Sequence, residues 1–238
     1  MSAVAVQGLK RILLPVAVLL VAMIGLGLLI TKVLAGTRPF IFEDDLEREL
    51  AGDRTESWNA VSSFFSLVGS TPVIIGVTVV IAIILRLTLH RWREPLFLAA
   101  AVSAQALVFF FATLVIDRAR PPVPHMDRSP PTSSFPSGHT SAAFALYVGL
   151  ALVLALLARR TALKWLCWLL VLVPLAVALA RMYRGMHHPS DVLASFLNGG
   201  ACVALMARAI LDRATVWGRN TQAAVVRPTA QRNTFRSP

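Results

Sequence analysis

Long apolar segments separated by short polar ones dominate the sequence. Six of them occur, at residues 12–34, 61–85, 95–116, 140–158, 165–180 and 192–207. A helix needs about 20 mostly apolar residues to cross a bilayer, and each segment is near that length. The two shortest are flanked by Lys164 and Arg208, whose long side chains can reach the membrane interface. The pattern therefore predicts an all-α polytopic membrane protein, a bundle of six transmembrane helices.

The first apolar segment has a second interpretation, as a cleaved signal peptide. Lys10 and Arg11 resemble the charged start of such a peptide, and residues 33–35 resemble a cleavage site. The segment is longer than the apolar stretch of about 7–15 residues that signal peptides carry. We therefore favour a retained membrane helix.

Composition agrees with a membrane protein. Of the 238 residues 56% are hydrophobic and only 15% are charged, with a mean hydropathy of +0.68. We expect one six-span domain over residues 1–210 and a basic, disordered cytoplasmic tail over 211–238. The net charge of +11 would also suit nucleic-acid binding, but the hydropathy argues against such a partner. Cys167 and Cys202 lie within apolar segments, which predicts buried thiols rather than a disulfide.

The distribution of charge predicts the orientation. With a cytoplasmic N-terminus, the cytoplasmic segments carry 14 basic and two acidic residues, against nine and ten on the other side. Lys and Arg gather on the cytoplasmic side of membrane proteins. We therefore expect segments 117–139 and 181–191 to lie on the extracytoplasmic side, and we expect the membrane to be the cell membrane. The acidic segment 35–60 lies on the same side; Leu46 and Leu50 suggest a short surface helix within an otherwise solvated linker, and no chemistry is assigned to it.

Candidate chemistry begins at Pro136–Ser137–Gly138–His139, where a polar loop meets an apolar segment. Ser137 is a suitable helix N-cap, and Gly138 allows a close approach of the backbone to a ligand. Backbone N–H groups at a helix N-terminus favour anions. This stretch therefore predicts an anion site.

Two further segments are expected on the same side of the membrane. Arg118 and Arg120 precede the loop, and residues 181–191 contain Arg181, His187 and Asp191. Pro189 is suited to the first position of a helix, which places Asp191 in its first turn and His187 just before it. Asp191 could then accept a hydrogen bond from His187 and prepare it as a nucleophile or base.

Each of these residues also has a plainer interpretation. Asp191 could serve only the helix dipole, and Arg181 could be an interfacial anchor. The histidines at 125, 139, 187 and 188 could in principle gather around a metal. Carboxylate–His and Cys–His ligand spacings are missing from the sequence, so we predict no metal site.

Together the segments resemble the signature of the type 2 phosphatidic acid phosphatase superfamily, which also includes vanadium-dependent haloperoxidases. Its Pro-Ser-Gly-His motif is matched in full at residues 136–139. Arg120–Pro121 match the end of its first motif, where Thr113 replaces a Lys. Arg181, His187 and Asp191 match its third motif with the correct spacing, and Ala180 stands where that motif has Ser.

The resemblance implies a role for each matching residue. His187 would attack phosphorus and form a phosphohistidine, Asp191 would fix its tautomer, and His139 would protonate the leaving oxygen and later activate water. The phosphate oxygens would be held by Arg120, Arg181, Ser137 and the Gly138 amide. Separately from the resemblance, Arg118, Arg128 and Arg184 are additional cations in the same loops that could replace the missing Lys, and Arg118 is favoured because it is nearest Arg120 in sequence. Arginine would supply the positive charge, so neither a metal nor another cofactor is expected.

The expected activity is hydrolysis of a lipid phosphate monoester or diphosphate at the membrane. Phosphatidic acid, phosphatidylglycerol phosphate and a polyprenyl diphosphate are the candidate substrates. Two alternatives stay open: a lipid phosphotransferase, and a non-catalytic binder or carrier of lipid phosphates, which the missing Lys would favour. A haloperoxidase is the least favoured, because such proteins are usually soluble.

Overall fold

The computed structural model describes residues 3–128 and 132–212, so the predicted tail lies almost wholly outside the described residues. The described part is helical and contains no strand. Its helices are α1 (Ala3–Leu28), α2 (Ile41–Gly52), α3 (Glu56–Val68), α4 (Thr71–Leu89), α5 (Arg93–Val115), α6 (Gly138–Ala143), α7 (Gly149–Leu157), α8 (Thr161–Trp168), α9 (Leu172–Tyr183) and α10 (Pro189–Met206). Four short π- or 3₁₀-helical turns continue these helices. The turns η1 (Leu29–Leu34) and η4 (Ala207–Leu211) extend α1 and α10, while η2 (Phe144–Val148) joins α6 to α7 and η3 (Leu169–Val171) joins α8 to α9.

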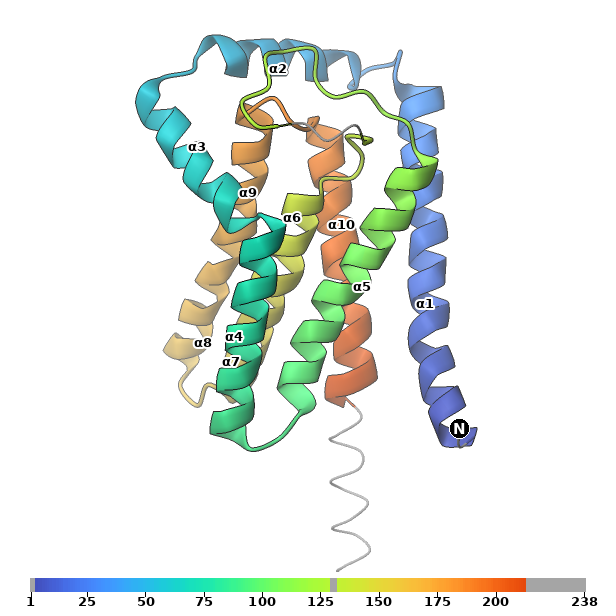
Figure 1. Ribbon diagram of the computed structural model, residues 1–238, viewed down its shortest axis with the longest axis vertical. Coiled ribbons are helices and arrows are strands. Elements are labelled where there is room, and N and C mark those ends of the chain that lie inside the picture. Colours follow the sequence, from blue (N-terminus) through green and yellow to red (C-terminus); the bar gives the residue numbers. More distant parts are fainter. Residues whose placement is uncertain (1–2, 129–131, 213–238) are drawn as a thin grey trace, which may run out of the picture.

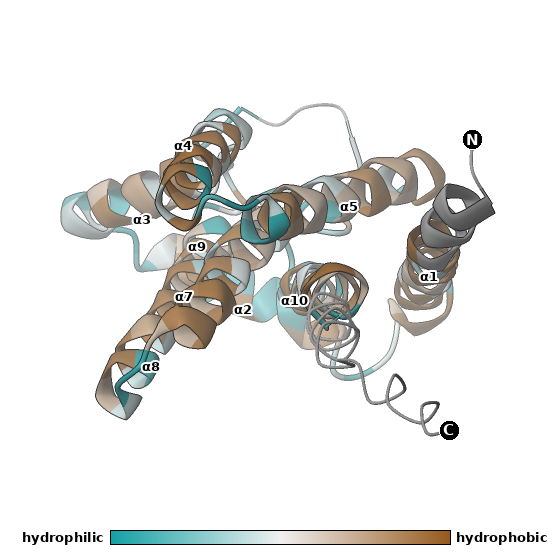
Figure 2. Cartoon of the chain, turned by 90° about the horizontal axis from the view of Figure 1, so that it is seen from below, coloured by the Kyte–Doolittle hydropathy of each residue, from teal (hydrophilic) through white to brown (hydrophobic). Residues whose placement is uncertain are grey.

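Six helical stretches in the described chain are long and apolar enough to cross a membrane. They are Ile12–Leu34, Thr71–Leu89, Arg93–Val115, Gly138–Leu157, Thr161–Tyr183 and Pro189–Leu211. Hydrophobic residues dominate these helices when the bundle is seen along its length (Figure 2). Many large apolar side chains point outward, including Leu87, Leu114 and Leu179. The protein is therefore an integral membrane protein with the predicted six-helix architecture.

The second predicted span is wrong in its boundaries. The apolar segment 61–85 is divided between α3 and α4, because Ser70 is extended and Pro72 lies in the first turn of α4. Proline has no N–H to donate, so it suits the start of a helix and ends the one before it. The membrane span begins only at Thr71. Helix α3 packs instead against α9, at one end of the bundle (Figure 1).

The acidic segment 35–60 contains the predicted short helix, α2, but it is not a solvated linker. Helix α2 lies across one end of the bundle (Figure 1), and the side chains of Glu43 and Glu47 are buried beneath it. Buried carboxylates need partners. This helix therefore belongs to the packed structure, and its acids enter the site described below.

The core of the bundle lies around α5, α6, η2 and α10, and includes Phe97, Leu98 and Leu146. Small residues allow the helices to approach closely, as is common in membranes. A Cβ on Gly199 would lie 2.8 Å from Cβ of Phe144 and 2.9 Å from the carbonyl oxygen of Ser141. Cys167 and Cys202 are buried free thiols, as predicted.

The two candidate loops lie at the same end of the bundle. The α5–α6 loop, the α9–α10 turn and α2 form one end, while the N-terminus of α1 and the α4–α5 and α7–α8 turns form the other (Figure 1). This arrangement follows from six alternating spans. It brings the sequence motifs to one membrane surface.

Contact between α1 and the α5–α6 loop predicts a specific sensitivity at Gly27. A Cβ there would lie 2.7 Å from the ring of Phe135 and would also collide with Ile116. We expect Gly27→Ala to destabilise the protein by roughly 1–3 kcal/mol through overpacking. Thermal unfolding of the purified protein in detergent measures this.

Gly25→Ala is the matched control, because nothing lies within 4 Å of a Cβ at that position. Alanine normally favours a helix over glycine by about 0.5–1 kcal/mol, so this control should be neutral or slightly more stable. Equal melting temperatures for the two variants would contradict the described packing of α1.

Candidate active site

The Pro-Ser-Gly-His stretch starts helix α6 as predicted. Ser137 is its N-cap: its hydroxyl accepts a hydrogen bond from the Thr140 N–H at 3.4 Å, and its own N–H donates to Oγ of Ser195 at 2.7 Å. Ser137 is fully buried, whereas Gly138 and His139 line a cavity. A Cβ at position 138 would lie 2.9 Å from the Phe109 ring, so glycine is needed there.

The cavity has a volume of about 750 Å³ and is lined by the α5–α6 loop, the α9–α10 turn and parts of α3, α4, α5, α6 and α9. One part of its wall is charged and polar. That part includes Arg120, Asp127, Arg128, His139, Arg181 and His187. The rest is mostly apolar and includes Leu67, Ile74, Ile75, Val102, Phe109 and Phe110. The fold thus brings four of the predicted side chains, those of Arg120, His139, Arg181 and His187, to one place.

His187 is buried in the α9–α10 turn and held by the backbone. Its Nδ1 lies 2.8 Å from the carbonyl oxygen of Ser134, which can only accept, so Nδ1 carries the proton and Nε2 keeps its lone pair. Burial lowers the pKa of His187 well below its ordinary value, and the charges of Arg181 and Arg120 act in the same direction. The imidazole is therefore neutral at neutral pH, which is the form that can act as a nucleophile.

The predicted hydrogen bond from His187 to Asp191 is wrong. Oδ2 of Asp191 lies 3.9 Å from Nδ1 of His187, too far for a hydrogen bond. The same oxygen instead accepts from the N–H of His188 at 2.9 Å, as part of a capping box at the start of α10. With Pro189 at the first helical position, Asp191 turns back towards the N-cap. It thereby fixes the turn that carries His187 rather than the imidazole itself.

Arg118 does not line the cavity, so its predicted role as a phosphate ligand finds no support in this geometry. Its guanidinium pairs with Asp191 at 2.5 Å and with Glu43 at 2.8 Å, and it also donates to Oγ of Ser190 at 2.7 Å. Glu43 in turn accepts from the N–H of Ser190 at 2.8 Å. No sequence pattern indicated this ion-pair cluster, because Glu43 lies in a distant segment of ordinary acidic composition.

Arg120 and Arg181 keep donor groups available. Arg120 donates one Nη1 hydrogen bond to the carbonyl of Met186 at 2.7 Å, and Arg181 donates from Nη1 to Ser66 at 2.8 Å. The Nε atoms of both are buried without a hydrogen-bond partner. Burial lowers the pKa of Arg120, and the charge of Asp191 opposes this only in part. Two guanidinium groups with unused Nε donors, one buried (Arg181) and one half-buried (Arg120), are suited to holding an anion.

Asp127 is a site residue that the sequence analysis missed. It accepts from Arg181 at 2.6 Å and from Arg184 at 2.6 Å, and Ser66 donates to it at 3.0 Å. Burial raises the pKa of Asp127, but the two arginines outweigh it and hold the pKa below its ordinary value. Asp127 thus fixes Arg181 in position and occupies Arg184. A lone acid in a loop has no local pattern that would have revealed this.

His139, in the first turn of α6, completes the polar wall. Its backbone packs on the α3–α4 junction, where a Cβ on Gly69 would lie 3.4 Å from Cβ and from the carbonyl oxygen of His139. Thr113, at the position of the missing Lys, donates its hydroxyl to the Phe110 carbonyl at 2.8 Å and does not line the cavity. Of the three additional arginines considered for this role, Arg128 is the one that does.

Comparison with known proteins identifies the family of this chain. The family model described as the PAP2 superfamily matches residues 12–214. The chain belongs to the PAP2 superfamily. The predicted family is thereby confirmed, and the match includes all six spans and both loops of the site.

Two solved structures share the PAP2 fold with this chain. The first is the transmembrane PAP2-type phosphatidylglycerolphosphate phosphatase from Bacillus subtilis, with a TM-score of 0.67 and 19% identity, covering 80% of this chain and 93% of that one. The second is LpxE from Aquifex aeolicus, with a TM-score of 0.54 and 22% identity, covering 69% and 93%.

One curated relative matches a shorter stretch of this PAP2 protein. The lipid A 1-phosphatase of Helicobacter pylori is 46% identical over 72 residues, which is 30% of this chain. The match spans about a third, 34%, of the length of that relative. It supports a likeness in sequence over that segment.

Because Arg118 and Arg128 have different surroundings, we expect their replacement by alanine to have different effects on stability. Arg118→Ala would leave Asp191, which is completely buried, and Glu43 without their cation. Breaking a buried pair in this way costs about 3–5 kcal/mol, so we expect a clearly lower melting temperature in detergent. Arg128→Ala removes an exposed side chain at the cavity mouth and should leave the melting temperature unchanged.

Binding of inorganic phosphate should separate the same two variants in the opposite way, with the larger effect in Arg128→Ala. Arg128→Ala should weaken it by roughly 3–10-fold through loss of a charge-assisted contact. Arg48→Ala, on the exposed face of α2, is the control for loss of one positive charge. Unchanged phosphate affinity in Arg128→Ala, or an unchanged melting temperature in Arg118→Ala, would contradict these assignments.

Proposed function

We propose that this PAP2 protein is a membrane phosphatase that hydrolyses a lipid phosphate monoester or diphosphate through a phosphohistidine intermediate. The observation that carries the proposal is the composition of the cavity described above. Two histidines and two partly unpaired arginines share that cavity with a long apolar wall. Phosphoryl chemistry accounts for the polar part, and a lipid accounts for the apolar part.

The apolar wall supports a lipid substrate. Ile75 of α4 and Phe110 of α5 line the cavity, and about half of each side chain is exposed. Since both lie on membrane-spanning helices, an acyl or prenyl chain could stay in the bilayer while its phosphate reaches Arg120 and Arg181. A small soluble phosphate ester would leave this wall unused.

The names of the relatives point in the same direction. The Helicobacter pylori relative is a lipid A 1-phosphatase, and the Bacillus subtilis structure is a phosphatidylglycerolphosphate phosphatase. Both names denote lipid phosphates. Phosphatidic acid, phosphatidylglycerol phosphate, a polyprenyl diphosphate and lipid A 1-phosphate therefore form the test panel.

In the first chemical step, Nε2 of His187 attacks phosphorus, a nitrogen–phosphorus bond forms and the bond to the lipid oxygen breaks. His139 gives its proton to that leaving oxygen. Arg120 and Arg181 hold the equatorial oxygens, where negative charge is spread in the transition state. The Ser134 carbonyl accepts from Nδ1 of His187 and so stabilises the imidazole as it becomes cationic.

In the second step, His139 takes a proton from water, and that water attacks the phosphohistidine. The nitrogen–phosphorus bond breaks, inorganic phosphate leaves, and His187 returns to its neutral form. Because the arginines carry the positive charge, the chemical steps need no metal. Asp191 acts through the turn that it holds, and Ser137 through the helix that it caps.

The two histidines should be separable by leaving group. A lipid alkoxide is strongly basic and needs an acid, whereas a nitrophenolate leaves without one. His187→Ala should be inactive on a lipid phosphate and on an aryl phosphate. His139→Ala should lose roughly 100-fold or more on the lipid but still release phenolate and accumulate acid-labile phosphoenzyme. Released phenolate, inorganic phosphate and protein-bound phosphate are measured after a quench.

His125→Ala, in the same loop but away from the cavity lining, is the matched control and should behave like the wild type. A phenolate burst in His187→Ala and none in His139→Ala would reverse the two roles. If the folded wild type binds the lipid phosphates but releases nothing from any of them, the phosphatase proposal fails in favour of a carrier. Transfer of the phosphoryl group to an acceptor other than water would identify a phosphotransferase.

We further propose that the cavity opens on the extracytoplasmic side of the cell membrane, on the basis of the charge asymmetry. In a background with Cys167 and Cys202 replaced by Ala, a cysteine at exposed Asp45 on α2 should react with an impermeant thiol reagent in intact cells. A cysteine at exposed Thr161, at the other end of the bundle, should react only after lysis. The opposite labelling pattern would place the cavity in the cytoplasm.

A further inference from the structure

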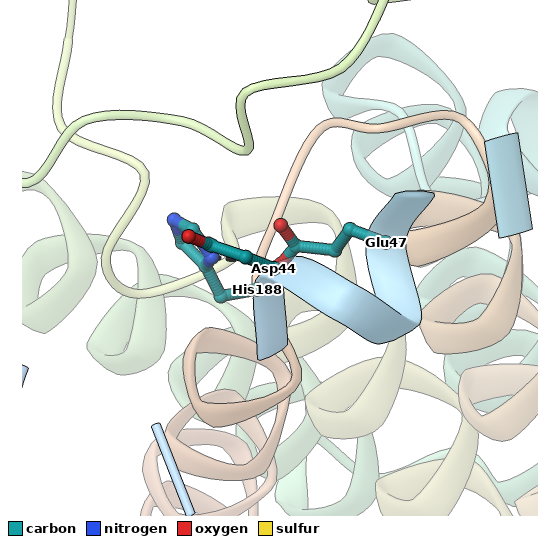
Figure 3. Close-up of side chains that lie close together, drawn as sticks. All are labelled: Asp44, Glu47 and His188. Atoms are coloured by element: carbon teal, nitrogen blue, oxygen red, sulfur yellow. Dashed lines mark ion pairs between the residues drawn. The ribbon is translucent and has the colours of Figure 1, made fainter. Parts of the chain in front are cut away.

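A second group of ligand-bearing side chains lies outside the cavity. Asp44 and Glu47, one helical turn apart on α2, face His188 at the N-cap of α10 (Figure 3). One potential ligand atom from each of the three lies within 4.8 Å of the others. None of these residues lines the cavity, and none has a part in the proposed chemistry.

Glu47 is the residue that most needs explanation. Only 1% of its surface is exposed, and Oε1 lies 2.7 Å from Nδ1 of His188. Its Oε2 is buried without a hydrogen-bond partner among the described residues. Burial raises the pKa of Glu47, although the hydrogen bond and charge of His188 oppose the rise. A buried carboxylate oxygen without a donor is costly, so this side chain has an unused capacity for a cation.

His188 is oriented as a metal ligand would be. Its Nε2 lies 3.1 Å from the carbonyl oxygen of Ala119, which can only accept, so Nε2 carries a proton. Nδ1 is thereby directed at the carboxylates (Figure 3). Metal-binding histidines characteristically donate their second N–H to a carbonyl or carboxylate in this way. A proton shared by Nδ1 and Oε1 of Glu47 would then occupy the place that a cation could take.

Charge also favours a cation here. Within the described part of the chain, no Lys or Arg forms an ion pair with Asp44 or Glu47, and the nearby Arg118 is engaged by Glu43 and Asp191. One divalent ion would neutralise both carboxylates. An imidazole with two carboxylates suits zinc and similar transition metals, whereas magnesium and calcium prefer oxygen ligands alone.

We propose that Asp44, Glu47 and His188 bind a divalent transition-metal ion of the zinc class. Three protein ligands at about 2.0–2.2 Å leave one coordination position for water. The ion would displace the proton between His188 and Glu47, and half-buried Asp44 would turn inward to complete the site. It would fasten α2 to the start of α10, directly beside His187. This binding is independent of the proposed phosphatase activity.

The test is zinc binding by the purified full-length protein after treatment with EDTA. Bound zinc is measured by mass spectrometry after gel filtration, and affinity by calorimetry with zinc chloride. We expect about one zinc per chain, a higher melting temperature with zinc, and release of about one proton for each zinc bound, seen as a dependence of the heat on the buffer. Glu47→Gln and Asp44→Asn should each weaken binding at least 10-fold and lose the increase in melting temperature.

Asp45→Asn is the matched control, because Asp45 is an exposed acid on the same helix that pairs with Arg48. It should bind zinc like the wild type. His187→Ala should also retain zinc, which separates this site from the cavity histidines. If Glu47→Gln does not fold, Asp44→Asn still decides, since Asp44 forms no ion pair in the described structure. Absence of bound zinc in the wild type, equal affinity in Asp44→Asn, or loss of zinc in His187→Ala would overturn the proposal.

Discussion

The ion pairs of Arg118 hold together three parts of the chain on which the site depends. One guanidinium joins Glu43 of α2 and Asp191 of α10 to the loop that follows α5. Both carboxylates are buried, so removal of this cation would leave uncompensated charge at the membrane surface. Because Asp191 also fixes the N–H of His188, the pairing reaches the turn that positions His187. An acidic helix outside the bundle is thus part of the active-site framework.

The arginines near the cavity differ in function according to the carboxylates beside them. Arg118 and Arg184 are paired with acids and stabilise the fold. Arg120 and Arg181 retain buried Nε donors that a phosphate could use, and Asp127 holds Arg181 in place. The arginines at this membrane surface therefore include both members of structural ion pairs and donors suited to an anion. The apolar wall of the cavity could accommodate the hydrocarbon chain of a lipid phosphate.

The sequence by itself determined the membrane architecture and the position of the motifs. Hydropathy over about 20 residues is a local property, so six spans could be predicted without any knowledge of their packing. Alternation of the spans then placed both motif loops at one end. Caps and prolines act within one turn of helix, and for that reason Ser137 and Asp191 were correctly placed at helix starts. The break before Thr71 was missed, because hydropathy continues across it while the backbone does not.

The tertiary structure decided which groups contact one another within the site. The partner of His187 is the backbone carbonyl of Ser134, which any residue could supply and which therefore leaves no mark on the sequence. Which arginines are taken up by ion pairs was decided by Glu43 and Asp127, acids that are distant in sequence or without a local pattern. Whether Glu47 is solvated or buried was likewise fixed by the docking of α2 on the bundle. Such pairings are set by packing in three dimensions, and burial then makes each charge depend on its partner.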